Sequence, residues 1–484
     1  MSAARSGGGS SVSRSTDSAP APAETESTSA ETTASETDVG TSASGEANAD
    51  ATDAEAPLLA ARNISKYYDQ SEGFLDDLIG DARPVRAVDG VDLEVRRGET
   101  LAVVGESGCG KSTLGRTLLN LESVTGGHIE YRGEDITGLS GSAMQPYRRD
   151  LQMVFQDPLA SLNPRQTVGE ILKAPMEVHG IGESDEERTE RVRELLGLVG
   201  LKEGHLDRYP RQFSGGQQQR VGVARALTLS PELIVADEPV SALDVSVQAQ
   251  ILDLLDDLQT ELDLALCFVT HDLSVVRHVA DRVAVMYLGE IIETAPVEEL
   301  FANPRHPYTK SLLSAVPRID PAARTDRTVL EGTVPSPADP PSGCRFHTRC
   351  PAVIPPAEWA GTQAEFKSAF TFRNRVLGEE IDPEAIRTRL SAESAATDND
   401  AVATRITERF VPDTDAQLPA NARKAIENAA ARLANGETEA AKTTVTEAFP
   451  SPCEDETPRD TPTEGGHVAC HRVDPEMPGD PDVL

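Results

Sequence analysis

At 484 residues, the chain is long enough for two or three domains and a sizeable hydrophobic core. Its 80 acidic and 45 basic residues give a formal net charge of −35, which argues against a nucleic-acid-binding protein because phosphate binding needs a cationic face. The excess of acid is explained either by ordinary solvating charge or by a halophilic origin. In a cytosol with molar salt, the Debye length falls to about 3 Å and self-repulsion is screened.

Cysteine content and hydropathy favour a cytoplasmic protein. Six cysteines are few for this length, and the N-terminus lacks the apolar core of a secretory signal, so we expect a reducing compartment without a disulfide framework. No uncharged apolar run approaches the ~20 residues that a membrane-spanning helix needs. Any role at a membrane must therefore depend on a partner.

Composition divides the chain into three parts. Residues 1–56 contain no Leu, Ile, Phe, Tyr or Trp, so they bury too little apolar surface to offset their ordering entropy, and we predict a disordered acidic tail. In residues 57–300, short apolar strands alternate with helical patterns, which predicts an α/β fold with parallel strands and crossover helices. Within this part, residues of about 157–230 lack strand patterns and predict an inserted helical subdomain.

The third part, residues 301–484, is predicted to be a C-terminal extension of different texture. It carries a Pro- and Cys-rich stretch, "TVPSPADPPSGCRFHTRCP", which indicates an irregular module. Residues of about 378–448 are mostly helical by propensity. The last 35 residues are again rich in Pro, Gly and acid.

Three of the predicted strands, 100–105, 233–237 and 265–272, are followed by or end in polar residues. The first runs into "GESGCGKST", which fits the phosphate-loop pattern. Its glycines let backbone N–H groups turn toward the β-phosphate, and the N-terminus of the next helix attracts anions. Lys111 is predicted to contact the β- and γ-phosphates and Ser112 to bind Mg²⁺. The predicted ATP-binding residues of this loop are Gly105, Glu106, Ser107, Gly108, Cys109, Gly110, Lys111, Ser112 and Thr113.

The second predicted strand, in "LIVADEP", supplies the other half of a nucleotide site. Asp237 ends the apolar run and is predicted to hold Mg²⁺, directly or through water. Glu238 is placed to polarise an attacking water, which is the role of a general base.

These motifs resemble the ATP-binding cassette (ABC) ATPase family. The family's fold combines a phosphate-loop core sheet with a helical subdomain and an antiparallel β part. "RQFSGGQQQR" is similar to the family signature, with Phe213 where the family usually has Leu. The resemblance implies that two cassettes dimerise head to tail and that each signature caps the γ-phosphate on the partner's loop. The residues acting in trans are Ser214, Gly215, Gly216 and Gln217.

The resemblance implies further site residues. Gln156 in "VFQDP" matches the loop glutamine that senses Mg²⁺ and water and links to the membrane subunit, and His271 in "VTHD" matches the switch histidine. Tyr68, with Tyr67 as a substitute, matches the aromatic residue that stacks on adenine. The implied catalytic set is Glu238, His271 and Gln156, the implied Mg²⁺ ligands are Ser112, Gln156 and Asp237, and the implied dimer-interface residues are Ser241 and Asp244.

Longer stretches are similar to the ATP-binding subunits of oligopeptide and dipeptide importers, in particular the F-type member. These include "MVFQDPLASLNPRQTVGEI", "NPRHPYTKSLLSAVP" and the Cys-rich tail. Relative to this subfamily, residues of about 69–84 lengthen the first hairpin, and residues of about 352–448 interrupt the tail motif as an insertion. The resemblance implies a second, D-type cassette as heterodimer partner, two transmembrane permease subunits and, indirectly, an extracellular binding protein. It also implies a peripheral location at the cytoplasmic face of the membrane, and ATP and Mg²⁺ as cofactors.

Four tail cysteines leave two alternatives open. Their spacings are not those of a zinc ribbon, but some relatives of this subfamily bind an iron–sulfur cluster through four such residues. The resemblance therefore implies a [4Fe–4S] cluster, or zinc, as one reading; free thiols are the other. The residues are Cys344, Cys350, Cys453 and Cys470.

Other functions remain open from the sequence. The same ATPase role could serve import of a sugar or nickel, because an ATPase subunit does not contact the cargo. A repair or translation ATPase would need a coiled-coil insertion or two cassettes in one chain, and each motif occurs once. A regulatory cassette without turnover would have degenerate motifs, whereas Lys111, Glu238 and His271 are intact.

Overall fold

The computed structural model describes residues 56–69, 84–316, 330, 332–393, 396–410 and 418–477. All of these belong to one compact unit, residues 52–484. Residues 1–55 of the predicted disordered tail and residues 70–83 of the predicted longer first hairpin (about 69–84) lie outside the described residues. None of the described helices has the length and apolar character that a membrane span requires.

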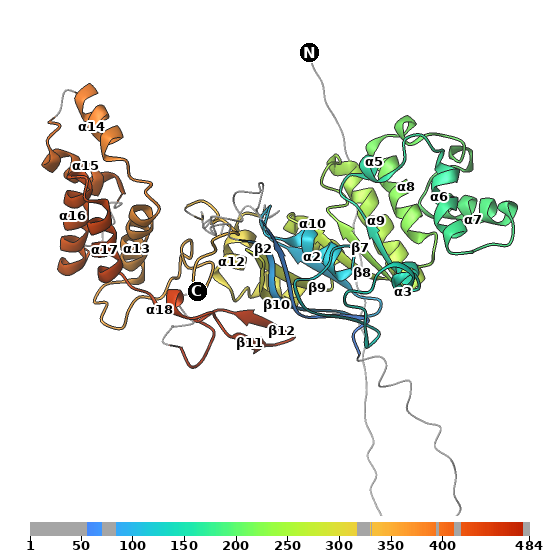
Figure 1. Ribbon diagram of the computed structural model, residues 1–484, viewed down its shortest axis with the longest axis horizontal. Helices are drawn as coiled ribbons and strands as arrows, with labels where there is room; N and C mark the ends of the chain where they lie inside the picture. Colours follow the sequence, from blue (N-terminus) through green and yellow to red (C-terminus); the bar gives the residue numbers. More distant parts are fainter. Residues whose placement is uncertain are drawn as a thin grey trace, which may run out of the picture. The chain divides into compact units, whose positions relative to one another are not determined.

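An eight-stranded sheet forms the centre, in the order β11-β12-β10-β9-β3-β8-β7-β6 (Figure 1). The five strands from β9 to β6 pair in parallel, and β10, β12 and β11 add an antiparallel edge. The strands are β3 (Thr100–Val104), β6 (Leu151–Val154), β7 (Leu233–Asp237), β8 (Ala265–Thr270), β9 (Arg282–Tyr287), β10 (Glu290–Pro296), β11 (Asp460–Thr463) and β12 (Gly466–Ala469).

The apolar runs of β3, β7 and β8 are buried along their whole length, as expected for parallel strands covered on both faces. Successive side chains of a strand point to opposite faces. Leu101 and Val103 belong to the core shared with the antiparallel sheet, whereas Ala102 and Val104 belong to a second core shared with the C-terminal extension. The parallel α/β fold predicted from the sequence is thereby confirmed.

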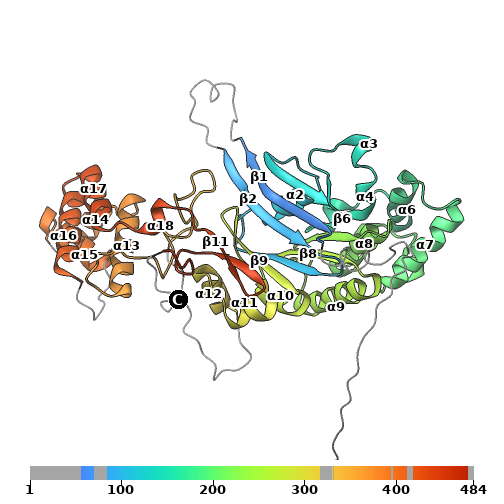
Figure 2. The ribbon, with the colours of Figure 1, turned by 90° about the horizontal axis from the view of Figure 1, so that it is seen from below.

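A smaller antiparallel sheet packs over the first of these cores, in the order β2-β1-β4-β5. Figure 2 shows its strands β1 and β2 side by side. Its central strand β1 pairs with β2 and β4, so that Leu59 lies opposite both Val95 and Tyr131. The strands are β1 (Leu59–Tyr68), β2 (Val85–Val95), β4 (Gly126–Tyr131) and β5 (Glu134–Asp135). Helix α2 (Lys111–Leu118) packs in the same core, and α3 (Gly141–Met144) and α4 (Tyr147–Asp150) precede β6.

Every described element between β6 and β7 is helical. Side-chain caps begin the three longer helices at Thr167, Ser184 and Ser214, because a Ser or Thr oxygen satisfies a free N–H of the first turn. The elements are α5 (Pro158–Ser161), α6 (Val168–Val178), α7 (Asp185–Leu198), the short helices Glu203–His205 and Pro210–Gln212, and α8 (Gly215–Leu227).

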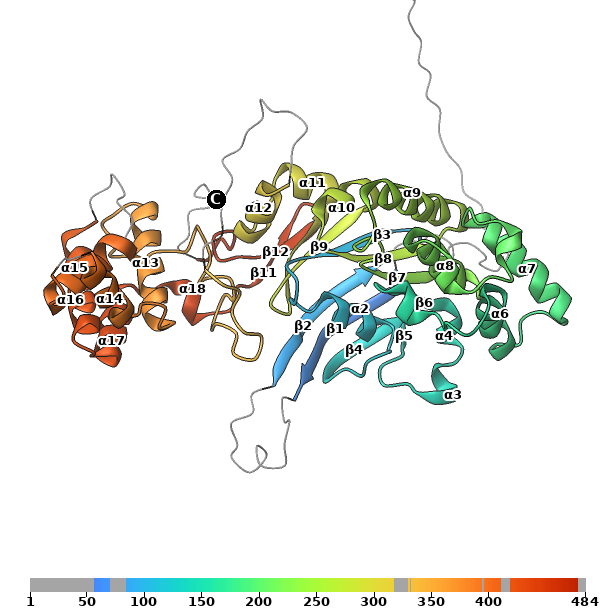
Figure 3. The same cartoon turned by 90° about the horizontal axis from the view of Figure 1, so that it is seen from above.

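Helix α9 (Val245–Leu262) follows β7 and α10 (Leu273–Val279) follows β8, whereas α11 (Val297–Ala302) and α12 (Pro307–Ser314) follow β10 (Figure 3). In the predicted insertion, five helices pack against one another between Cys350 and Cys453 (Figure 1). These are α13 (Gln363–Leu377), α14 (Pro383–Ala392), α15 (Asn399–Phe410), α16 (Ala420–Ala434) and α17 (Thr438–Ala448), and α18 (Pro452–Asp455) follows them.

The C-terminal extension also contributes to the central sheet, which the sequence did not predict. Strand β12 pairs with β10, so that Val468 lies opposite Glu293, and β11 pairs with β12. Both strands are four residues long and carry Pro, Gly and polar residues, so they show no period-two pattern. Pairing with β10, and not local propensity, makes them strands.

Candidate nucleotide site

The phosphate loop leaves β3 and turns into α2 at Gly110. Gly110 has φ 107°, and a Cβ at this position would lie 1.9 Å from the carbonyl oxygen of Ala87, so only glycine fits. Lys111 is buried, and its Nζ donates to the carbonyl oxygens of Gly105 and Glu106 at 3.0 Å each. Ser107 and Gly108 are exposed. The loop thus offers an open backbone with a lysine ammonium inside it, which suits a phosphate chain.

Cys109 in the same loop is buried, and burial raises the pKa of its thiol. A protonated, buried thiol is inert. This residue therefore contributes packing and backbone to the loop.

Asp237 at the end of β7 lies beside this loop. The hydroxyl of Ser112 donates to its Oδ1 at 2.7 Å, and Arg116 of α2 lies 3.8 Å from its Oδ2. The carboxylate is buried, and burial raises the pKa of Asp237, partly offset by Ser112 and Arg116. A hydroxyl and a carboxylate at this distance suit a Mg²⁺ ion, which prefers oxygen ligands.

Glu238 is held between the two residues predicted to work with it. Gln156 Nε2 donates to its Oε2 at 2.8 Å, and His271 Nδ1 lies 3.0 Å from its Oε1. The backbone of Glu238 has φ 44° and its N–H donates to the carbonyl of Val269 at 2.9 Å. A left-handed conformation at a residue other than glycine costs free energy and is typical of functional sites. The structure thus brings Gln156, Glu238 and His271 together at the carboxyl ends of β7 and β8.

Tyr68 lies at the end of β1 and is 38% exposed. Its hydroxyl donates to Glu122, and the side chains of Thr113 and Arg116 lie close enough to influence its pKa, which burial raises. The aromatic ring therefore lies next to the helix that follows the phosphate loop. Tyr67 points elsewhere, because its hydroxyl donates to Asp89 on β2.

The predicted signature residues form the beginning of α8. Ser214 Oγ accepts from the N–H of Gln217 at 3.4 Å, and Gln217 Oε1 accepts from the N–H of Ser214 at 3.1 Å. Ser214 and Gly215 are exposed, whereas Gly216 is packed so tightly that a Cβ would lie 2.2 Å from Val247. Among the hydrogen bonds of the described residues, none joins residues 214–217 to the phosphate loop. The exposed Ser214 and Gly215 are accessible to another molecule.

The predicted interface segment lies between Glu238 and α9. The hydroxyl of Ser241 donates to the carbonyl of Glu238 at 3.1 Å. Asp244 caps α9, accepting from Ser246 and from the N–H of Val247, and these hydrogen bonds lower its pKa. The segment is thereby fixed in position directly after the general-base candidate.

The four tail cysteines line one small cavity together with His306, His347 and His471, although the first and the last cysteine are 126 residues apart in the sequence. All four are free thiols. Burial and the charge of neighbouring cysteines raise the pKa of Cys344 and Cys350, and the pKa of Cys470 rises to about 11. No group of three or more His, Cys, Asp or Glu side chains within the described ranges is arranged to hold a single metal ion.

Two residues that the sequence reasoning missed contact the phosphate loop. The hydroxyl of Tyr308 accepts from the N–H of Glu106 at 2.9 Å, and Arg349 makes a double hydrogen bond with the Glu106 carboxylate. They lie 202 and 243 residues away along the chain. No local pattern marks such a contact, although Arg349 lies in the Pro- and Cys-rich stretch and Tyr308 in "NPRHPYTKSLLSAVP".

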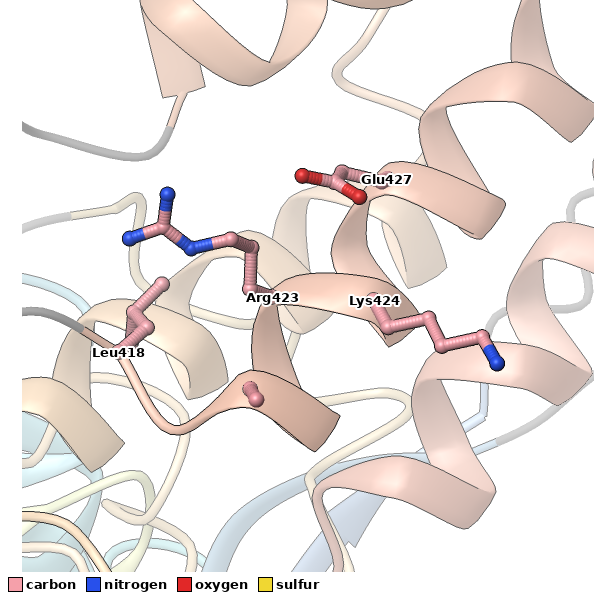
Figure 4. A pocket seen from close by; sticks show the side chains of 5 residues that line it. Leu418, Arg423, Lys424 and Glu427 are labelled. Atoms are coloured by element: carbon pink, nitrogen blue, oxygen red, sulfur yellow. The ribbon is translucent and has the colours of Figure 1, made fainter.

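A hollow on the helical insertion differs from the nucleotide site in how its polar side chains are arranged (Figure 4). It is lined by Leu418, Ala420, Arg423, Lys424 and Glu427. The side chains of Arg423, Lys424 and Glu427 point in different directions and not toward a common point. The hollow therefore lacks the converging polar groups of a binding site.

Three known sequence families match the chain. The ABC transporter family matches residues 88–241, and the oligopeptide/dipeptide transporter C-terminal region matches residues 292–355. A domain of unknown function matches residues 363–466, which include α13 to α17.

Individual relatives agree with these matches. The chain is 53% identical to the oligopeptide transport ATP-binding protein AppF of Bacillus subtilis (strain 168) over 301 residues, which are 62% of this chain and 90% of the relative. It is 51% identical to the dipeptide transport ATP-binding protein DppF of Escherichia coli (strain K12) over 296 residues, 61% of this chain and 87% of the relative. Among solved structures, the ATP-binding cassette MJ0796 bound to ADP and Pi is 31% identical, with a TM-score of 0.45, covering 50% of this chain and 99% of that chain.

Proposed function

We infer that this chain, which belongs to the family of ABC transporter ATP-binding proteins, hydrolyses ATP to power the import of oligopeptides or dipeptides. The observation that carries the ATPase activity is Glu238, whose carboxylate lies between Gln156 and His271 at 2.8 and 3.0 Å. Beside it lie a buried lysine in a phosphate loop and the Ser112–Asp237 pair.

In this reaction, Lys111 and the backbone of the loop bind the phosphates and Tyr68 stacks on adenine. Ser112, Asp237 and Gln156 would hold Mg²⁺, which neutralises charge on the phosphate oxygens. Glu238 accepts a proton from the attacking water, and His271 keeps the carboxylate and the water in position. The oxygen of that water forms the new bond to the γ-phosphorus as the bond to ADP breaks.

Replacing Glu238 tests this assignment. We expect Glu238→Gln to bind ATP but to lose hydrolysis by at least a hundredfold, because an amide cannot accept the proton. Glu232→Gln is the matched control, since Glu232 precedes the other end of β7 and pairs with Arg132. Parent-like turnover by Glu238→Gln would show that another group is the base.

We further propose that the catalytic unit is a head-to-tail dimer of cassettes. Ser214 and Gly215 at the beginning of α8 are exposed and make no hydrogen bond to their own phosphate loop. This supports a contact between these residues and the γ-phosphate bound by the partner. The segment with Ser241 and Asp244 would lie along the same interface. The partner is expected to be a second, D-type cassette.

The substrate class follows from two comparisons. The match to the oligopeptide/dipeptide transporter C-terminal region and the names of the relatives both support peptides. The chain would then act at the cytoplasmic face of a membrane, bound to two transmembrane permease subunits that receive peptide from an extracellular binding protein. Copurification with those subunits, and ATPase stimulation by peptide-loaded binding protein in proteoliposomes, test this proposal; stimulation by sugar or nickel alone would contradict it.

The four tail cysteines are proposed to hold a [4Fe–4S] cluster. They line one cavity, and burial and the charge of neighbouring cysteines raise the pKa of Cys344 and Cys350. Four thiolates in one cavity would serve as soft ligands, each binding a different iron atom. His471 Nδ1, buried without a hydrogen-bond partner within the described chain, lies in the same cavity wall.

Anaerobic purification tests the cluster. We expect about four iron atoms per chain and a broad visible absorption band, both lost in Cys453→Ser. Cys267→Ser is the matched control, since Cys267 is a buried cysteine of β8 away from the cavity. Protein without iron would contradict the proposal, and stoichiometric zinc would favour the other metal.

A further inference from the structure

The loop formed by residues 344–350, here called the 344–350 loop, lies against the nucleotide site. Tight turns shape it, because the N–H of His347 donates to the carbonyl of Cys344 at 2.9 Å and the N–H of Arg349 to that of Phe346 at 3.0 Å. Both arginines of the loop, Arg345 and Arg349, are 7% exposed. A buried arginine needs a partner, and each of these finds it in the cassette.

Arg349 binds the phosphate loop through Glu106. Its two terminal nitrogens donate to the two carboxylate oxygens of Glu106 at 2.7 and 3.0 Å. The guanidinium also lies 5.9 Å from the ring centroid of Tyr287 and donates to its hydroxyl at 3.4 Å. A paired, charge-assisted hydrogen bond of this kind fixes both distance and orientation.

Glu106 is held at three points. Besides its carboxylate, its N–H donates to the hydroxyl of Tyr308, and its carbonyl accepts from Lys111 Nζ at 3.0 Å. Tyr308 is itself fixed by the rings of Tyr287 and Phe346, with centroids at 4.8 and 5.3 Å. The side chain, the amide and the carbonyl of one loop residue are therefore all set by neighbours.

Arg345 extends the contact to the antiparallel sheet. It pairs with Asp89 on β2 and with Glu290 on β10, the latter at 2.9 Å. Asp89 also accepts from the hydroxyl of Tyr67, the neighbour of Tyr68. The 344–350 loop thus contacts both parts of the cassette that flank the nucleotide.

We propose that Arg349 is a positioning residue for ATP binding, which holds the phosphate loop in its binding conformation through Glu106. This inference rests on the proposed ATP site. The Cys-rich extension then serves the nucleotide site directly, whatever its cysteines bind. Without Arg349, the Glu106 carboxylate would be half-buried and unpaired, and the loop would need to be ordered by ATP itself.

Steady-state ATPase kinetics of the full chain with its copurifying cassette test the proposal. We expect Arg349→Gln to raise the KM for ATP about tenfold while kcat at saturating ATP falls less than threefold, because bound phosphates restore the loop. Arg349→Lys should give an intermediate KM, since a lysine ammonium can replace one of the two parallel hydrogen bonds that the guanidinium donates. The matched control is Arg373→Gln, because Arg373 is an equally buried arginine that pairs with Glu454 within the extension.

A double-mutant cycle separates positioning from general damage. If Arg349 acts through Glu106, Arg349→Gln combined with Glu106→Gln should have the KM of the worse single variant. If the effects of the two substitutions on KM instead multiply in the double variant, the proposal is overturned. It is also overturned if Arg373→Gln raises KM as much as Arg349→Gln does. If Arg349→Gln does not fold, the same double-mutant cycle can be measured with Arg349→Lys in its place, alone and combined with Glu106→Gln.

The outcomes distinguish this inference from the proposed function. A parent protein that neither binds nor hydrolyses ATP would overturn the proposed function itself. A parent that hydrolyses ATP, with an unchanged KM in Arg349→Gln, would overturn the positioning role alone.

Discussion

At the scale of single residues, the hydrogen bonds of Glu238 decide how the site would react. A carboxylate that is to accept a proton from water must be oriented before the reaction, and Gln156 and His271 each fix one of its oxygens. The buried neighbour Asp237 is instead engaged by Ser112. Two adjacent carboxylates thus have separate partners, which supports separate roles.

His271 gives a prediction at this scale. We expect His271→Ala to lower kcat about a hundredfold, because one oxygen of Glu238 loses its partner, with ATP binding changed little. His278→Ala should leave kcat unchanged, since His278 is exposed on the neighbouring α10. ATP turnover and binding of a fluorescent nucleotide measure the two quantities. Equal loss of binding and turnover would instead mean that His271 mainly holds the nucleotide.

At the scale of elements, the beginning of α8 has two tasks. Ser214 caps the helix for its own chain, and in the proposed dimer its exposed hydroxyl meets the partner's nucleotide. Ser184 provides the same cap for α7, accepting from the N–H of Glu187 at 3.2 Å. The two caps allow the local and the intermolecular role to be separated.

We expect Ser214→Ala and Ser184→Ala each to lower the free energy of unfolding by about 1 kcal/mol, the usual cost of a lost cap. Only Ser214→Ala should abolish ATP-dependent dimerisation and hydrolysis. Thermal denaturation and light scattering with ATP measure these effects. If both variants hydrolyse ATP equally well, Ser214 is a cap and nothing more.

The elements also show what the sequence can reveal. Strands β3, β7 and β8 are continuous apolar runs that end in or are followed by polar residues. Both the parallel sheet and the Mg²⁺-binding candidates could therefore be predicted from the local sequence. The pairing of β12 with β10 and of Arg349 with Glu106 joins residues far apart in sequence. No local sequence pattern identifies these residues as partners, because they meet only in the folded chain.

At the scale of the molecule, the C-terminal extension completes the central sheet. Val468 on β12 is fully buried, while its neighbour His467 is exposed. We expect Val468→Ala to lower the free energy of unfolding by about 2 kcal/mol and His467→Ala to leave it nearly unchanged. Thermal denaturation checks both; equal, small effects would mean that β11 and β12 contribute little to the stability of the sheet.

If ATP is hydrolysed at a site shared by two cassettes, ATPase turnover per chain must depend on their association. The protein would be purified in molar KCl and measured over a range of concentrations, alone and with its copurifying cassette, as parent and as Ser214→Ala. We expect turnover per chain to rise with concentration or with added partner and to be lost in Ser214→Ala. A turnover per chain that is constant with concentration, unaffected by the partner and retained in Ser214→Ala, would contradict a shared site.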